Sequence, residues 1–162
     1  MTAITLNNYD AAILADIRSA LAAATLSGAA VFSRVEYAGS LAEAKQKKFT
    51  GGAFAAVMYL HSDEYGISEL RRGVVTHYQI VVADKASAEL TRAQAVSGLV
   101  NSAKNAVETT PPSAASDFSI GETLYERIVW GVPDVDSLSN LDWAACVIPL
   151  SVAHVISSKT TH

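Results

Sequence analysis

Residues 71–84 read RRGVVTHYQIVVAD, and this stretch decides the fold. Side chains alternate along a β-strand, and this stretch is rich in the β-branched and aromatic residues that strands favour. One face then carries Val74, Thr76, Tyr78, Ile80 and Val82. The stretch predicts a long strand that helps to build a sheet. His77 in its middle and two arginines at its head leave open a second interpretation, the edge of an active site.

The neighbouring segments predict further strands. Residues 53–60 (AFAAVMYL) are apolar throughout and predict a central strand, and the polar residues 61–70 (HSDEYGISEL) predict a hairpin loop. Residues 123–130 and 142–156 predict two more strands near the end of the chain. Pro149 lies inside the last of these. Because proline lacks a backbone N–H, we expect a sheet edge or a bulge at that point.

Two segments predict amphipathic helices. Apolar residues recur at spacings of three and four across 8–26, where Gly28 is a natural stop. A second helix is predicted over 87–108, with Ser87 as its N-cap and a pair of prolines after its end. Between the first helix and the strand at 53–60, residues 30–37 predict a strand with one wetter side.

The order of these elements is helix, three strands, helix and two strands. It predicts one α+β domain over residues 1–162, with two main helices packed on one face of a mostly antiparallel sheet of about five strands. Long loops are expected at 38–52, 61–72 and 110–122, the first with a helical turn across LAEAKQKK. Loops of this length on a rigid scaffold are usually functional or disordered.

Composition narrows the class of protein. Half of the 162 residues are apolar, enough for a core, and the single cysteine, Cys146, rules out an internal disulfide. We expect Cys146 to be a buried apolar residue, with a reactive thiol as the alternative. The sequence has no signal-peptide pattern at its start and no apolar run long enough for a membrane helix, so a soluble protein made in the cytoplasm is expected.

Charge argues against nucleic-acid binding. The formal net charge is 12 − 16, or −4, and the densest basic cluster consists of Lys45, Lys47 and Lys48. A groove for nucleic acid needs more cations with aromatic residues between them. We therefore interpret these lysines as a solvated face.

The search for catalytic or metal-binding residues centres on the histidines. His61 is close in sequence to Asp63 and Glu64, which would suit a carboxylate-assisted base, but a solvated polar loop is the favoured interpretation. His77 and His154 both lie in predicted strands and could be cross-strand neighbours, either as a metal pair or, as we favour, as a polar pair. No HxH, GxSxG or phosphate-loop motif occurs. No catalytic residue, cofactor or metal is therefore predicted.

Three segments of the sequence, taken in order, indicate a family. The first is the helix YDAAILADIRSALAAA followed by VFSRVEYA. The second is the hairpin AFAAVMYLH with RRGVVTHYQIVVADK, leading into AELTRAQAVSGLVNSAKNAV, and the third is the closing pair ERIVWGVPDVDSL and LDWAACVIPLSVAHV. In this order the chain resembles the tail-terminator (tail-completion) proteins of long-tailed bacteriophages, including the neck proteins of Mu-like phages and prophages.

The resemblance implies a binding function and no enzymatic activity. A homohexameric ring would cap the tail tube, contact the tail tube protein on one side and the head–tail connector or adaptor on the other, and let DNA pass through its lumen without specific binding. Such a protein is made in the bacterial cytoplasm and ends in the neck of the virion. Six copies carry 6 × (−4), or −24, and an acidic lumen would repel DNA phosphates. Two alternatives stay open: another neck or head-completion adaptor, and a small-molecule-binding or enzymatic α+β domain.

Interface residues are expected on the polar loops. The inserts at 38–50 and 110–120 depart from the family pattern and could serve as arms that grip a neighbouring subunit. The expected contact residues are His61, Asp63, Glu64, Arg71, Arg72, Lys45, Lys47 and Lys48.

Overall fold

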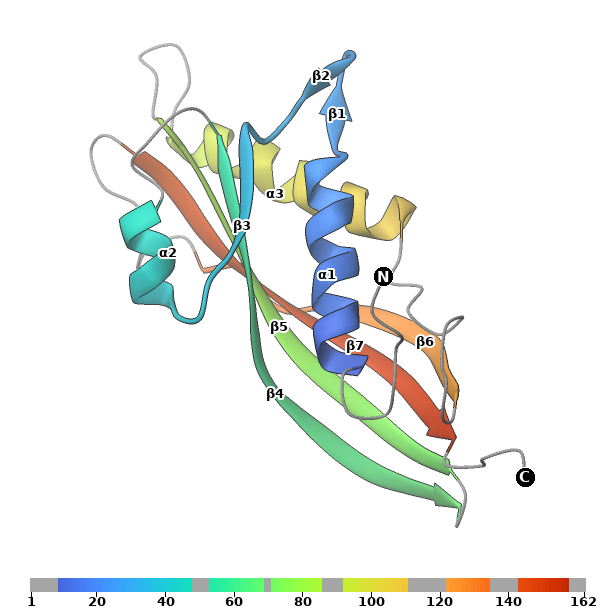
Figure 1. The fold of residues 1–162 in the computed structure, drawn as a ribbon. Coiled ribbons are helices and arrows are strands. Elements are labelled where there is room, and N and C mark those ends of the chain that lie inside the picture. Colours follow the sequence, from blue (N-terminus) through green and yellow to red (C-terminus); the bar gives the residue numbers. More distant parts are fainter. Residues whose placement is uncertain are drawn as a thin grey trace.

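The protein adopts an α+β fold built on one twisted sheet (Figure 1). The structure, a computed structural model, describes residues 9–47, 53–68, 71–85, 92–110, 122–134 and 143–157. The sheet has five strands in the order β3-β4-β5-β7-β6, and all neighbours are antiparallel except β3 and β4. This confirms the fold class expected from the order of elements.

The helices and strands agree in type and order with most of the predicted ones. In chain order they are α1 (Tyr9–Ala22), β1 (Thr25–Leu26), β2 (Ala29–Ala30), β3 (Arg34–Tyr37), α2 (Leu41–Lys47), β4 (Phe54–Ser68), β5 (Arg71–Lys85), α3 (Arg92–Thr109), β6 (Glu122–Trp130) and β7 (Trp143–Ser157). None of the helices in these ranges is long and apolar enough to span a bilayer. The proposed cap Ser87 and the segment 111–121 lie outside the described residues.

The main core lies between the sheet and the two long helices. Apolar residues at helical spacing on α1 and α3 pack against one face of β4, β5 and β7. Ile17 and Val107 are fully buried there. Tyr78 of β5 reaches across this layer, and its hydroxyl donates a hydrogen bond of 2.9 Å to the carbonyl oxygen of Asp10 in α1. Both main helices therefore cover the same face, as expected.

The short helix α2 covers part of the opposite face. Ser40 and Glu43 start it with a capping arrangement: the Ser40 hydroxyl accepts from the Glu43 N–H, and the Glu43 carboxylate accepts from the Gly39 N–H. Ala44 is buried in a second apolar cluster with Phe54. A parallel pair such as β3 and β4 needs a crossover, and α2 supplies it. The described part of the insert is thus sheet-covering structure and not an arm.

The first helix ends earlier than expected. It stops at Ala22, and the chain then forms the β1–β2 hairpin. Ser27 and Gly28 make its two-residue turn with φ angles of 52° and 81°. Positive φ at both central residues defines a turn that matches the strand twist. Gly28 is therefore a hairpin residue, and the prediction of a helix stop at this position was wrong.

The predicted hairpin loop 61–70 is largely strand. β4 continues through His61 to Ser68 and pairs with β5 as far as Ser68 opposite Arg71. The segment looked like a loop because its side chains are polar. The backbone nevertheless pairs with β5, and the described side chains of His61, Asp63 and Glu64 are solvent-exposed. The hairpin connection is thus much shorter than the sequence suggested.

Pro149 does not lie on an edge strand. β7 is paired on both sides, with β5 along its length and with β6 up to Trp130 opposite Leu150. The β6 side of the ladder is then interrupted and returns only as a bridge between Asp134 and Val147. Pro149 faces this interruption, so its missing N–H breaks no regular ladder. Of the two expected alternatives, the sheet edge is wrong, and instead of a bulge the structure has an interruption of the ladder on the β6 side.

Gly131 should be essential at this point, because its backbone lies close to Pro149. Its N–H donates a hydrogen bond of 2.9 Å to the Pro149 carbonyl, and a Cβ added to it would lie 2.7 Å from the Pro149 Cβ. The proline ring cannot rotate away. Gly131→Ala should therefore lower the free energy of unfolding by about 1–3 kcal/mol in urea titrations.

Gly98→Ala in α3 is the matched control. An added Cβ there meets nothing within 4 Å. Because alanine favours helix, this change should be neutral or stabilising by up to about 1 kcal/mol. Equal stability of the Gly131→Ala variant and the wild type would contradict the close contact with Pro149.

Candidate functional site

His61, Asp63 and His77 meet on the sheet face opposite α1 and α3. His61 on β4 is directly opposite His77 on β5, and their rings stack with centroids 4.5 Å apart at 29°. Asp63 Oδ2 lies 2.9 Å from His77 Nε2 and 3.5 Å from His61 Nε2. We call these three residues the histidine–aspartate cluster.

A β-bulge makes the cluster possible. Tyr59 is opposite Tyr78, but the next pair is His61 with His77, so Leu60 is an extra residue in β4. In a regular strand, residues 59 and 61 would share a face. The extra residue turns His61 and Asp63 to the face of His77 instead, which is a common effect of bulges. Nothing in the local sequence announces this bulge.

Ser151 fixes the orientation of the central histidine. Ser151 on β7 lies opposite His77 on β5, and its Oγ is 2.8 Å from His77 Nδ1. This contact leaves Nε2 directed at Asp63. The His77 side chain is 28% exposed, while those of His61 and Asp63 are 62% and 67% exposed. The cluster is thus anchored on the His77 side and open to solvent on the other.

A separate polar chain lies on the helix-facing side of the sheet. The Ser62 hydroxyl donates a hydrogen bond of 3.1 Å to Thr76 Oγ1, and Thr76 Oγ1 is 3.1 Å from His154 Nε2. Thr76 and His154 are fully buried. Burial lowers the pKa of His154 from 6.5 to about 4, so the imidazole is neutral near pH 7.

The expected pairing of His77 with His154 was wrong. His154 on β7 is opposite Val74 on β5, and His77 and His154 point to opposite faces of the sheet. The histidine that does meet His77 is His61, which the sequence had placed in a loop. The sequence analysis missed this pair because it ended the strand at residue 60, whereas β4 continues to Ser68.

The other proposed contact residues are scattered. Glu64 is exposed on β4, and strand alternation turns it to the face opposite Asp63. Arg71 and Arg72 are the first residues of β5, within the sheet and not on a long loop, and are paired through their backbones with β7. Lys45 and Lys47 belong to α2, and Lys48 lies outside the described residues.

Cys146 is a buried residue, as expected. Its side chain is in the core under α3. Burial and then the nearby charge of Asp134 raise the pKa of the thiol to about 11, with Lys104 acting in the opposite direction. The thiolate is therefore disfavoured near neutral pH, which argues against a nucleophilic role.

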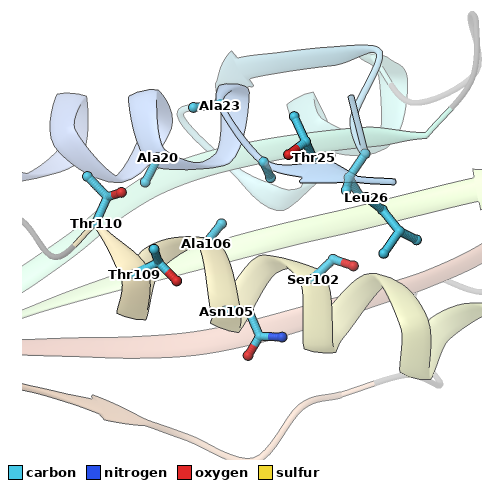
Figure 2. A pocket seen from close by; sticks show the side chains of 11 residues that line it. Ala20, Ala23, Thr25, Leu26, Ser102, Asn105, Ala106, Thr109 and Thr110 are labelled. Carbon is cyan, nitrogen blue, oxygen red and sulfur yellow. The ribbon is translucent and has the colours of Figure 1, made fainter. Parts of the chain in front are cut away.

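A hollow of about 270 Å³ opens between the end of α1, the β1–β2 hairpin and α3 (Figure 2). Its wall consists mainly of small side chains, with hydroxyls from Thr25, Ser102 and Thr109 and the amide of Asn105. A second hollow of about 500 Å³ shares Leu26 with it. The first hollow offers neutral hydrogen-bonding groups and apolar contact, and the second adds the carboxylate of Asp84.

The fold and site define an α+β protein with a polar cluster on the sheet face opposite its two long helices. No protein-family model matches the chain, and no curated protein matches it.

The buried His154 should make stability depend on pH. The unfolded chain takes up a proton on this residue near pH 6.5, and the folded protein only near pH 4. Stability should therefore fall as the pH drops through this window, by roughly 2–3 kcal/mol from His154 between pH 7 and pH 4.5. Urea unfolding of wild type and His154→Val at both pH values isolates this contribution. A variant that loses as much stability as the wild type would contradict it.

Proposed function

We propose that this protein is a structural subunit of a bacteriophage neck, which forms a homohexameric ring that terminates the tail tube and joins the tail to the head connector. The observation that supports a self-assembling role is the open edge of β4. β3 pairs with β4 only at Phe54–Val57. From Met58 to Ser68, no strand in the part of the chain that the structure describes pairs with the outer side of β4.

An open edge of this length is a template for another chain. Its outward-facing N–H and C=O groups extend for roughly 35 Å at the usual rise of a strand. Tyr59 and Leu60 add apolar surface beside it, with 39% and 44% of their area exposed. Addition of a neighbour's segment to such an edge supplies backbone hydrogen bonds and side-chain contacts together.

The part of the sheet that extends beyond α1 and α3 supports the same proposal. Figure 1 shows β4, β5, β7 and β6 running on past the ends of α1 and α3. A subunit that grips its neighbours head to tail needs two different surfaces, and such contacts close into a ring when the rotation fits. The projecting strands and the helix-covered body provide two such surfaces. The six-fold number rests on the resemblance to tail terminators.

A charge on the open edge should prevent assembly. Wild-type protein should have a mass near 102 kDa (6 × 17.0 kDa) by light scattering, with rings in negative-stain images. Leu60→Lys places a cation on the edge, as natural proteins do to block edge pairing, and should give monomers of 17.0 kDa. Val132→Lys, at a side chain that is 87% exposed outside β4, is the control and should still form rings.

The same measurements can contradict the proposed ring. Wild-type chains that stay monomeric at high concentration, and also form no ring on isolated tails, would contradict the proposal. Rings that bind connectors but not tail tubes would favour the alternative, another neck adaptor.

Arg71 and Arg72 lie at the far end of the projecting sheet, just after the β4–β5 connection. Arg71→Glu with Arg72→Glu should abolish the joining of heads to tails while the circular-dichroism spectrum stays native. Ser97→Glu with Asn101→Glu on the exposed face of α3 is the control and should leave joining unchanged. Normal joining by the double arginine variant would exclude this end of the sheet as the contact.

A further inference from the structure

The histidine–aspartate cluster has the composition of a metal site. It offers two imidazole nitrogens and one carboxylate oxygen, and the three ligand atoms all lie within 4.8 Å of one another. Nitrogen with a single oxygen suits zinc and its neighbours among the transition metals, whereas Mg²⁺ and Ca²⁺ prefer sets made of oxygen.

The distances fit coordination to one ion. Zinc bonds of about 2.0–2.1 Å place adjacent tetrahedral ligands about 3.3–3.4 Å apart. The two distances from Asp63 Oδ2, 2.9 Å to His77 Nε2 and 3.5 Å to His61 Nε2, lie on either side of this value. The two rings are stacked at 29°, so one imidazole must turn before both lone pairs point at the same ion. His61 is the ring that can turn, because its side chain is 62% exposed.

The surroundings of His77 match those of a metal ligand. Ligating histidines usually hydrogen-bond through the second ring nitrogen, which fixes ring orientation. Ser151 occupies this position, 2.8 Å from His77 Nδ1, on a third strand. In the structure His77 Nε2–H donates to the Asp63 carboxylate at 2.9 Å. A cation would replace this proton, and Nδ1 would then donate to Ser151 while the lone pair of Nε2 binds the ion.

From this geometry we propose that His61, Asp63 and His77 bind one divalent transition-metal ion, with zinc as the best fit. Three protein ligands leave a fourth tetrahedral position for water or for a donor from another molecule. The ion ties β4 to β5 beside the bulge at Leu60, where the ladder between these strands is irregular. The proposal stands on the cluster alone and does not depend on the ring.

Calorimetric titration with ZnCl₂ tests the site. Wild type should bind one ion per chain, and His61→Ala or Asp63→Asn should weaken binding at least tenfold. Ser151→Ala should weaken it by about 10- to 100-fold, because the ring orientation is lost. The matched control is Glu64→Gln, which removes the adjacent carboxylate on the opposite face and should leave zinc affinity unchanged.

Cobalt gives an independent readout of the ligands. CoCl₂ added to wild type should produce visible absorption bands that zinc abolishes and that excess MgCl₂ does not. The bands should be lost in His61→Ala, whose fold is checked by its melting curve. Absence of zinc binding to wild type, or equal binding by wild type, His61→Ala and Asp63→Asn, would overturn the proposal.

Discussion

The antiparallel ladder between β5 and β7 is the constraint on which the rest of the structure depends. Both strands have 15 residues, and they pair from Arg71 opposite Ser157 to Lys85 opposite Trp143. Each added strand takes its position from this pair, β4 beside β5 and β6 beside β7. Because side chains alternate, the same ladder defines two faces. One face packs against α1 and α3. The other packs against α2 and carries the histidine–aspartate cluster.

The length of the ladder explains why the sheet extends beyond the helices. A strand of 15 residues spans roughly 50 Å, whereas the 14 residues of α1 span about 21 Å. The helices can therefore cover only part of each face. The open edge of β4 and the polar cluster lie beyond the apolar packing under α2, and the buried hydrogen bond between Thr76 and His154 extends the interior into this region.

The sequence predicted those elements whose hydrophobic pattern reflects which side chains are buried. Alternation along 71–84 and helical spacing in 8–26 reflect burial, so both elements were found. β4 beyond Leu60 was missed because its polar side chains are exposed, and its strand conformation comes from β5, a partner that local sequence does not show. The site was predicted in part. His61 and Asp63 were predicted as contact residues, but their contact with His77 requires a bulge that no sequence pattern indicates. The SLAE sequence that caps α2 could have been recognised.

The open edge and the cluster both belong to β4, but they use different parts of it. Edge pairing uses backbone N–H and C=O groups in the plane of the sheet, whereas the cluster uses side chains that stand perpendicular to that plane. A neighbouring chain could therefore add to the edge without displacing His61 or Asp63. An ion that joins β4 to β5 would restrain the edge strand beside its bulge and reduce the entropy lost when a neighbour pairs with it. The proposed metal binding and the proposed self-assembly on this strand are thus compatible, and each would favour the other.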